Sequence, residues 1–345
     1  MAGLENYLGS LSLDDDDVKG AVLVQHLPSN SWFEGYAPRP NGGGLASRLD
    51  APELYLFHGS NPKAELELIY TFPIEEATGV VNLCPLLGRP DEFAVITGLV
   101  DMATVSFQNF IFWRVKLDSS NVEPPVVTRL ATLPEAGFCI GLVAATERTL
   151  LVADSAKHCI WQLDIESGKS SLLLEDSLME AASEEDFFGL NRIRVGGGYV
   201  WFTNSSAGLL GRFAVDIKEG EATEITTSGS VEILAADIQH CDGLALSKDF
   251  TAAFAVSYLG GFMWKVSLDK DGGLGSTRVV MQHLVSPTHV EIAYLDGKPK
   301  IYVVCCGQIE HGWVNDHDRT SWSDLANINA AVSVTVTVSE EVETT

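Results

Sequence analysis

The sequence contains no uninterrupted run of about 18 apolar residues, so it lacks the signature of a membrane-spanning helix. It is also poor in basic residues, with 22 lysines and arginines against 47 aspartates and glutamates, for a formal net charge of −25. This excess of negative charge repels nucleic-acid phosphates and anionic lipid headgroups, and we therefore expect neither nucleic acid nor a membrane as a partner. The N-terminal residues show no basic region followed by an apolar core and a cleavage site, which predicts a cytoplasmic protein.

Several short motifs that carry chemistry are missing as well. The sequence has no GxSxG nucleophile elbow, no P-loop, no HExxH and no CxxC pair, so serine-hydrolase, nucleotide-hydrolase and zinc-finger functions lack support. Its 6 cysteines do not suggest a disulfide framework in a chain of 345 residues. Cys305 and Cys306 are adjacent, and adjacent residues of a strand point to opposite faces. We expect reduced thiols.

What the chain does contain is one pattern that recurs through six repeats, at intervals of about 50 residues. A strand-like run ends in small or polar residues, and after a short break an aromatic-centred run usually closes on Asp. Residues 149–155 with 160–164 and residues 199–205 with 211–216 are examples. A period of this size, built from β-branched and aromatic residues, is typical of a β-propeller in which each repeat is one blade. The sequence therefore predicts an all-β, six-bladed β-propeller.

The uninterrupted repeats predict a single propeller domain over residues 20–339, between a flexible acidic tail over residues 1–19 and a frayed tail over residues 340–345. Residues 20–28, GAVLVQHLP, form an outer strand that has no blade of its own to finish. We expect this strand to pair into the last blade, together with the alternating stretch 331–338, and so to close the ring.

Two connecting segments also stand out. Residues 176–186, DSLMEAASEED, are predicted to form a short helix between blades. The third repeat interval has extra length around residues 101–109, and we expect a lid loop there because long loops between regular elements often carry function.

The innermost strand of each blade lines the central channel of a propeller, so one position per repeat faces a shared cavity. Alignment of the inner strands gives WFEGYA, GVVNLC, FCIGLV, GLNRIR, HCDGLA and PTHVEI. Their third positions are Glu34, Val81, Ile140, Asn191, Asp242 and His289. The polar members come from neighbouring blades, and Val81 and Ile140 form the other arc. The sequence predicts a pocket with one polar and one apolar side.

The segments WFEGYAPRPNGGGLASRLDAPELYLF, FCIGLVAATERTLLVADSAKHCIWQLDIESGK, GLNRIRVGGGYVWFTN and CDGLALSKD resemble the six-bladed propellers of the senescence marker protein/gluconolactonase family, especially its fungal branch. The resemblance runs from about residue 20 to residue 307. In that family a divalent cation, usually calcium, is held at the channel mouth by Glu, Asn and Asp, which the resemblance places on Glu34, Asn191 and Asp242. The family's further Asn falls on Ile140, and His289 stands where the fungal pattern usually has a small residue.

Some intracellular members of the fungal branch are similar in lacking a secretion signal, and they work in secondary metabolism. They include the hetero-Diels–Alderases that join a tropolone-derived quinone methide to a humulene-type sesquiterpene alcohol, giving a meroterpenoid. The resemblance to this subgroup implies a pericyclase with terpenoid and polyketide-derived small molecules as its partners. This reaction requires no cofactor, although one Ca²⁺ ion could be bound at the family's cation site.

The predicted site of such an enzyme has catalytic and substrate-binding members. The catalytic candidates are His289, Asp242, Glu34 and Arg39, and the substrate-binding candidates are Val81, Ile140, Asn191, Tyr258, Trp32 and Phe33. We expect His289 or Arg39 to donate a hydrogen bond to the heterodiene oxygen. Asp242 or Glu34 would act as the acid–base group if the quinone methide is made in the same site. The apolar partner would lie against Val81, Ile140 and nearby aromatic rings.

Other interpretations remain open. A metal-dependent lactone hydrolase would polarise the lactone carbonyl with the cation and use Asp242 as base. A binding module would use the propeller as a scaffold without catalysis. Glu34, Asn191 and Asp242 could also serve only to tie inner strands together, and His289 could be a channel residue with no part in turnover. The oligomeric state is left open.

Overall fold

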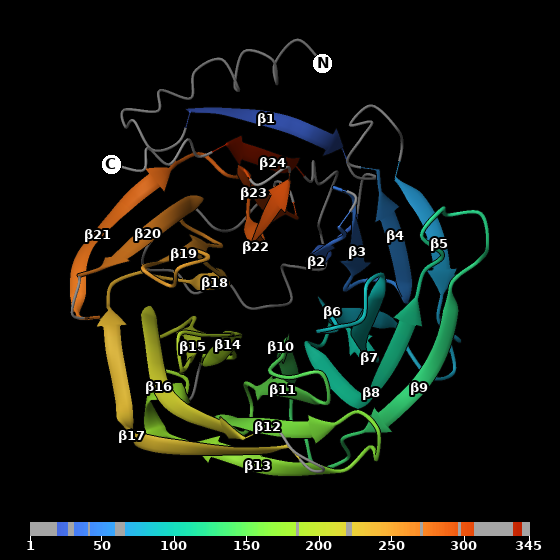
Figure 1. Cartoon of the computed structure of the whole chain (residues 1–345), viewed down its shortest axis with the longest axis horizontal. Coiled ribbons are helices and arrows are strands. Elements are labelled where there is room, and N and C mark those ends of the chain that lie inside the picture. Colours follow the sequence, from blue (N-terminus) through green and yellow to red (C-terminus); the bar gives the residue numbers. More distant parts are fainter. Residues whose placement is uncertain are drawn as a thin grey trace.

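The structure is a computed structural model, and it describes residues 19–26, 31–40, 42–58, 66–183, 186–218, 223–269, 272–295, 298–306 and 334–339. Within these ranges the strands form six four-stranded sheets arranged around a central axis (Figure 1). The one described element that is not a strand is η1, a short 3-10 turn over Ser177–Met179. The predicted all-β propeller fold is confirmed.

Five of the sheets are each made of four strands that follow one another along the chain. The first contains β2 (Phe33–Pro38), β3 (Gly44–Arg48), β4 (Glu53–Phe57) and β5 (Glu67–Thr71), and the second contains β6 (Gly79–Pro85), β7 (Glu92–Asp101), β8 (Ser106–Lys116) and β9 (Val126–Thr132). The third contains β10 (Cys139–Ala144), β11 (Thr149–Asp154), β12 (Cys159–Asp164) and β13 (Ser170–Glu175). The fourth contains β14 (Leu190–Gly196), β15 (Tyr199–Asn204), β16 (Leu209–Lys218) and β17 (Glu224–Ala235), and the fifth contains β18 (Cys241–Leu246), β19 (Ala252–Ser257), β20 (Phe262–Leu268) and β21 (Leu274–Met281).

The remaining sheet combines strands from both ends of the described chain. It contains β22 (Pro287–Leu295), β23 (Lys298–Cys305), β24 (Val334–Ser339) and, at its outer edge, β1 (Lys19–His26). β1 is antiparallel to β24 (Figure 1). Lys19 is thereby aligned with Ser339, and His26 with Val334. Apart from Lys19, the tails predicted over residues 1–19 and 340–345 lie outside the described residues.

Each inner strand begins with an irregularity in its pairing with the second strand of its sheet. In β2, for example, Phe33 pairs with Arg48 and Gly35 pairs with Ser47, so that Glu34 is skipped. The skipped residues are Glu34, Val81, Ile140, Asn191 with Arg192, Asp242 with Gly243, and Thr288. A bulge removes a residue from the ladder and turns its side chain out of the regular alternation. The bulges therefore decide which side chains can meet at the hub.

Glycines allow neighbouring inner strands to approach one another at the level of these bulges. A Cβ atom on Gly141 would lie 2.5 Å from the Asn191 carbonyl oxygen, and one on Gly243 would lie 2.6 Å from the Val290 nitrogen. Because both contacts are with backbone atoms, a side chain at either position would force adjacent sheets apart. The hub is therefore narrow where these glycines lie.

The two connecting segments differ from their predicted forms. Asp176 caps η1 by accepting a hydrogen bond of 2.9 Å from the Leu178 N–H, but the backbone is already extended at Glu180. The helix predicted over residues 176–186 is thus reduced to one turn in its described part. The lid loop predicted around residues 101–109 is instead the end of a hairpin, in which β7 and β8 continue as paired strands with Asp101 opposite Ser106.

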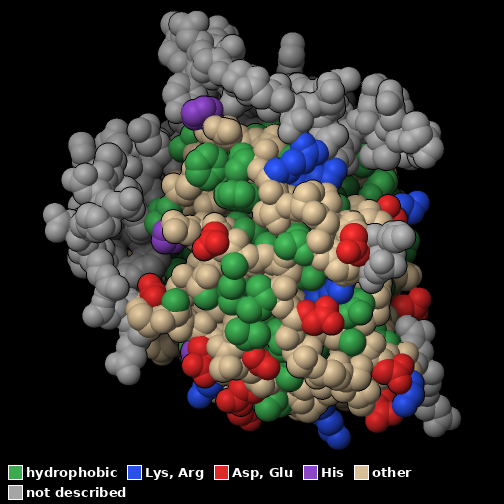
Figure 2. Space-filling model, turned by 90° about the vertical axis from the view of Figure 1, so that its left-hand side faces the viewer, with side chains coloured by type: hydrophobic (Ala, Val, Ile, Leu, Met, Phe, Trp, Pro, Cys, Tyr) green, Lys and Arg blue, Asp and Glu red, His purple; other side chains and the backbone are tan. Residues whose placement is uncertain are grey.

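No helix in the described part of the chain has the length and apolar character needed to cross a membrane. Figure 2 shows the side of the molecule that lies at the left of Figure 1, where β17 and β21 are found. Acidic side chains are scattered over this side among apolar and neutral ones. Lys and Arg side chains also appear on this side, in a group near the top of the view and singly elsewhere.

Deletion of residues 1–26 tests the contribution of the β1–β24 pairing. We expect a lower thermal midpoint and self-association, because the edge of β24 would present unpaired N–H and C=O groups to other chains. Differential scanning calorimetry and size-exclusion chromatography measure the two effects. A chain shortened by residues 1–18, which keeps β1, is the control, and equal behaviour of the two shortened chains would contradict the prediction.

Candidate functional site

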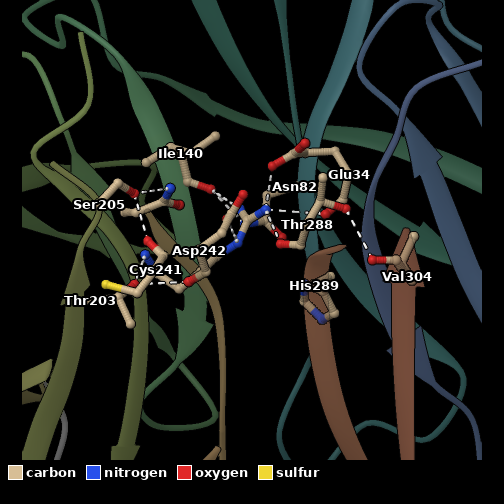
Figure 3. A network of polar contacts seen from close by, with 12 residues as sticks. Glu34, Asn82, Ile140, Thr203, Ser205, Cys241, Asp242, Thr288, His289 and Val304 are labelled. Atoms are coloured by element: carbon tan, nitrogen blue, oxygen red, sulfur yellow. Dashed lines mark hydrogen bonds and ion pairs between the residues drawn. The ribbon is translucent and has the colours of Figure 1, made fainter. Parts of the chain in front are cut away.

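A single arginine, Arg192, lies at the hub among the bulged residues of the inner strands. Its side chain is fully buried. Nη1 donates a hydrogen bond of 2.7 Å to the Ile140 carbonyl oxygen, and Nη2 donates to the carbonyl oxygens of Glu34 at 3.1 Å and Thr288 at 3.4 Å. These acceptors belong to β10, β2 and β22 and surround the centre of the network in Figure 3. The guanidinium therefore connects the sheet of β14 to the inner strands of three others.

Hydrogen bonds within its own sheet and to the next sheet hold Arg192 in this position. Its backbone N–H donates a hydrogen bond of 3.0 Å to Thr203 Oγ1, and that hydroxyl donates one of 2.9 Å to the Asp242 carbonyl oxygen. On the other side, Asn82 Nδ2 donates to the Ile140 carbonyl oxygen at 2.5 Å, so this oxygen accepts from two donors. The position of the guanidinium is thus fixed by hydrogen bonds on both sides.

Two carboxyl groups face this one guanidinium. Glu34 Oε1 accepts a hydrogen bond from Arg192 Nη2, and Glu34 Oε2 accepts one of 2.7 Å from Trp32 Nε1. Asp242 Oδ1 lies 3.6 Å from Arg192 Nε. Glu34 is therefore a charge partner with both oxygens engaged, whereas Asp242 is near the positive charge without a hydrogen bond to it.

Burial dominates the protonation of both carboxyl groups. Burial raises the pKa of Asp242 well above its usual range against the opposing effect of Arg192, and the negative charge of Glu34 raises it further. Burial also raises the pKa of Glu34, opposed by Arg192 and by the hydrogen bond from Trp32. One positive charge cannot compensate two buried negative charges. Asp242 therefore keeps its proton at pH values where an exposed aspartate has lost it.

Two buried acceptor atoms beside Arg192 have no hydrogen-bond partner within the described residues: Asn191 Oδ1 and Asp242 Oδ1. Asn191 is oriented by its amide, since Nδ2 donates a hydrogen bond of 2.8 Å to Ser205 Oγ, which donates one of 2.7 Å to the Cys241 carbonyl oxygen. An unsatisfied buried polar atom is costly, and in a native protein it often marks a place for water or a ligand. The polar side of the hub can accept hydrogen bonds from a small hydroxylated molecule.

An apolar cluster adjoins this polar group. Val81 and Ile140 at the hub belong to one core cluster with Trp32, and Tyr258 packs against it. The rings of Trp32 and Tyr258 are stacked with centroids 5.7 Å apart. Trp32 directly precedes β2, and Tyr258 directly follows β19, so both lie at the end of the channel where the bulges are. The structure therefore places four of the predicted substrate-binding residues in one cluster: Trp32, Val81, Ile140 and Tyr258.

The hairpin end of β7 and β8 adds aromatic rings to the same cluster. The centroids of Phe107 and Phe138 are 4.0 Å apart, and Phe187 lies 5.7 Å from Phe107 and 5.6 Å from Phe138. Phe188 is 5.6 Å from Phe138. Sequence reasoning singled out the extra length of this segment but missed its aromatic character.

The structure places Thr288, and not His289, in the ring of hub residues. The bulge of β22 skips Thr288, while His289 is paired with Val304. Thr288 Oγ1 donates a hydrogen bond of 2.9 Å to the Phe33 carbonyl oxygen, whereas His289 points away from the network and no interaction reaches it in Figure 3. The alignment was wrong by one residue because a bulge has no signature in the hydrophobic pattern, and one residue reverses the face of a strand.

His289 is nevertheless buried in the channel wall. Its Nε2 lies 3.7 Å from Glu291 Oε2, and neither ring nitrogen has a hydrogen-bond partner among the described residues. Burial lowers the pKa of His289 to about 4, and the positive charges of Arg194 and Arg192 act in the same direction, against a raising effect of Glu291. The imidazole is therefore neutral at pH 7.

Arg39 and Phe33 do not join the hub. Arg39 Nε donates a hydrogen bond of 2.7 Å to Asp91 Oδ1, and Nη1 donates one of 2.6 Å to Asn121 Oδ1. Arg39 follows the far end of β2, roughly 16 Å along the strand from Glu34. Phe33 is fully buried in the core cluster between the first and last sheets and packs edge-on against Tyr55.

Arg192 is the site residue that sequence reasoning missed. The alignment predicts one hub residue per inner strand, the third, whereas Arg192 is the fourth residue of GLNRIR. The sequence does contain a signal for Arg192. The fourth residues of the other aligned segments are uncharged: Gly35, Asn82, Gly141, Gly243 and Val290. A lone charge in a buried strand is rarely tolerated unless it is paired.

The three side chains assigned to a divalent cation lie at the hub, but their donor atoms do not fit one. Both oxygens of Glu34 already accept hydrogen bonds, and Arg192 places a positive charge between Glu34 and Asp242. Among the described residues there is no group of three or more His, Cys, Asp or Glu side chains arranged to hold a metal ion.

No protein-family model matches the sequence, and no curated protein matches it. Solved structures with a similar fold exist. The PQQ-bound aldose sugar dehydrogenase from Streptomyces coelicolor has a TM-score of 0.59 at 12% identity, over 92% of this chain and 98% of that one. A luciferin-regenerating enzyme has a TM-score of 0.59 at 12% identity, over 94% and 96% of the two chains. Virginiamycin B lyase from Staphylococcus aureus has a TM-score of 0.51 at 13% identity, over 82% of each. At such identities the likeness concerns the propeller fold.

The neutral His289 predicts a pH dependence of stability. A histidine in the unfolded chain has a pKa of about 6.5, so between pH 7 and pH 5 the unfolded state takes up a proton that folded His289 does not. Stability is then lost as the pH falls, by about 2 kcal/mol from this group. Urea unfolding at both pH values should give a shallower decrease for His289→Leu than for the wild type. Identical decreases in the two proteins would show that His289 is not buried as a neutral base.

Proposed function

We propose that this propeller is a biosynthetic enzyme that binds an amphiphilic, oxygenated metabolite at the hub and catalyses an intermolecular hetero-Diels–Alder cycloaddition. Its substrates are a tropolone-derived quinone methide and a sesquiterpene alcohol. The observation that carries the proposal is the juxtaposition of two polar groups, the Asn191 amide and the Asp242 carboxyl group, with an apolar cluster that contains Val81, Ile140 and Trp32. Each polar group has an oxygen without a hydrogen-bond partner among the described residues. The resemblance of the sequence to the fungal secondary-metabolite propellers supports the same reaction.

The cycloaddition requires the two partners to be held together and in register. It forms one C–C and one C–O bond, releases no atom and needs no external oxidant or reductant. Orientation of two bound reactants can contribute about 7–11 kcal/mol to lowering the barrier. In this proposal the terpene lies against the apolar cluster, and the oxygenated ring lies over Asn191 and Asp242.

Asp242 is the acid in this proposal, in place of His289 and Arg39. A protonated carboxyl group can donate a hydrogen bond to the heterodiene oxygen, where negative charge develops in the transition state. It can also make the quinone methide from a hydroxylated precursor. Asp242 gives its proton to the departing hydroxyl group as the C–O bond breaks, water leaves, and the carboxylate takes the proton of the tropolone hydroxyl. Glu34 remains the charge partner of Arg192.

A metal-dependent lactone hydrolase is the second candidate, because Glu34, Asn191 and Asp242 do lie together at the hub. It would require Arg192 to give up Glu34 before a cation could use that carboxylate. The likeness in fold to an aldose sugar dehydrogenase and a luciferin-regenerating enzyme is compatible with either reaction.

The two candidates are separated by one set of incubations. Purified protein is mixed with a tropolone quinone-methide precursor and a humulene-type sesquiterpene alcohol, with and without chelator, and the adducts are followed by liquid chromatography and mass spectrometry. We expect accelerated formation of one stereoisomer that the chelator does not reduce. Background rates in every sample would refute the pericyclase. In parallel samples that contain a lactone instead of these substrates, chelator-sensitive hydrolysis would favour the second candidate.

Asp242→Asn should separate the two roles of the carboxyl group. The amide can still donate a hydrogen bond, but it cannot supply a proton. We expect kcat to fall about 100-fold with the hydroxylated precursor and much less with a quinone methide generated in solution. Asp216→Asn, on an exposed part of β16, is the matched control. Equal losses with both substrates would remove the acid role of Asp242.

Ile140→Asn tests the apolar side of the hub. It places an amide in the apolar cluster, and we expect a higher KM for the sesquiterpene alcohol and an altered stereoisomer ratio, because the terpene would desolvate a polar group without replacing its hydrogen bonds. Ile140→Val, which keeps the side chain apolar, should retain both values. Steady-state kinetics with the terpene varied measure the effect. An unchanged KM in the Asn variant would place the terpene elsewhere.

A further inference from the structure

Arg192 has a structural role at the hub that is separate from any reaction catalysed there. We propose that the guanidinium of Arg192 is a built-in cation that takes the place of a divalent metal ion, so that the wild-type protein holds its hub together without binding one. The proposal concerns the residues at the centre of the fold and does not depend on the proposed function.

The guanidinium supplies the positive charge that a metal ion would bring. Arg192 is fully buried and lies against the Glu34 carboxylate and within 3.6 Å of Asp242. A buried carboxylate needs a compensating positive charge, which either a metal ion or a guanidinium can supply. An arginine stays protonated at any pH at which proteins are folded. The charge is therefore permanent and independent of the cation concentration.

The guanidinium also connects inner strands of different sheets. A metal ion at the hub of a propeller would tie inner strands together through their oxygen atoms. Arg192 does so through hydrogen bonds to the carbonyl oxygens of Ile140, Glu34 and Thr288, which belong to three different sheets. A guanidinium has five N–H donors in a rigid plane, and this geometry suits several acceptors at once.

Without the arginine side chain, several oxygen atoms at the hub would be left without a hydrogen-bond donor. Glu34 Oε1 and the Ile140 carbonyl oxygen would lose a donor, and Asn191 Oδ1 and Asp242 Oδ1 already have none within the described part of the chain. Carboxylate, amide and carbonyl oxygens are the ligands that Ca²⁺ prefers. Truncation of Arg192 should therefore create a calcium site that the wild type does not have.

The test is a gain of metal binding in Arg192→Ala. Ca²⁺ is titrated by calorimetry, and Tb³⁺ serves as a luminescent substitute. Trp32 Nε1 donates to Glu34 Oε2, so a Tb³⁺ ion on Glu34 would lie close to the indole and be sensitised by it. We expect no saturable binding to the wild type and binding of one ion to Arg192→Ala, with a Kd on the order of 0.1–1 mM for Ca²⁺. The thermal midpoint of the variant, but not of the wild type, should rise with Ca²⁺.

Three control variants define the site. Adding Glu34→Gln to Arg192→Ala should abolish binding, and adding Trp32→Phe should reduce sensitised luminescence but not the calorimetric signal. Arg39→Ala removes another buried arginine, one that pairs with Asp91 away from the hub, and should bind no ion. Saturable Ca²⁺ binding by the wild type that Glu34→Gln removes would overturn the proposal.

A folded Arg192→Ala protein that binds neither ion would overturn it equally. If that variant cannot be obtained in folded form, Arg192→Gln, which removes the charge but keeps part of the side chain, replaces it in the same titrations. The wild-type titration tests the proposal without either variant, because it measures directly whether the native hub binds a cation.

Discussion

The structure depends on the compensation of one buried positive charge. An unpaired guanidinium in the interior would be strongly destabilising, and Arg192 is stabilised by carbonyl oxygens from three other sheets and by the carboxylate of Glu34. These acceptors are in place only when their inner strands have assembled around the channel. The arginine thus couples the local geometry of one bulge to the completion of the ring, and it leaves the second carboxyl group, on Asp242, without a charge partner of its own.

The bulges convert a repeated fold into an asymmetric site. Every inner strand contributes at the same level, yet the skipped residues differ in kind: apolar in β6 and β10, and polar or charged in β2, β14, β18 and β22. Because the scaffold fixes the positions, a substitution at one bulge changes the chemistry of the channel without changing the sheets. Such an arrangement lets one propeller fold serve unrelated reactions.

The sequence was informative wherever the pattern is periodic. The repeat of strand-like runs predicted the propeller, and the common pattern of the inner strands located Glu34, Val81, Ile140, Asn191 and Asp242, all of which are skipped by bulges. It failed where the local backbone departs from the period. The bulge of β22 falls one residue before His289, and β14 skips two residues, so that Arg192 enters the hub. Neither shift changes the hydrophobic alternation on which the alignment rested.

The pairing of β1 with β24 has a consequence for biosynthesis. Of the described strands, β1 is synthesised first and β24 last, yet they are neighbours in one sheet. β1 therefore has no partner from β24 until residues 334–339 have been translated, while the five sheets made of consecutive strands can form in order as they emerge. The sheet that contains β1 and β24 is therefore the last of the six to be completed, and a chain that stalls before β24 cannot complete the propeller.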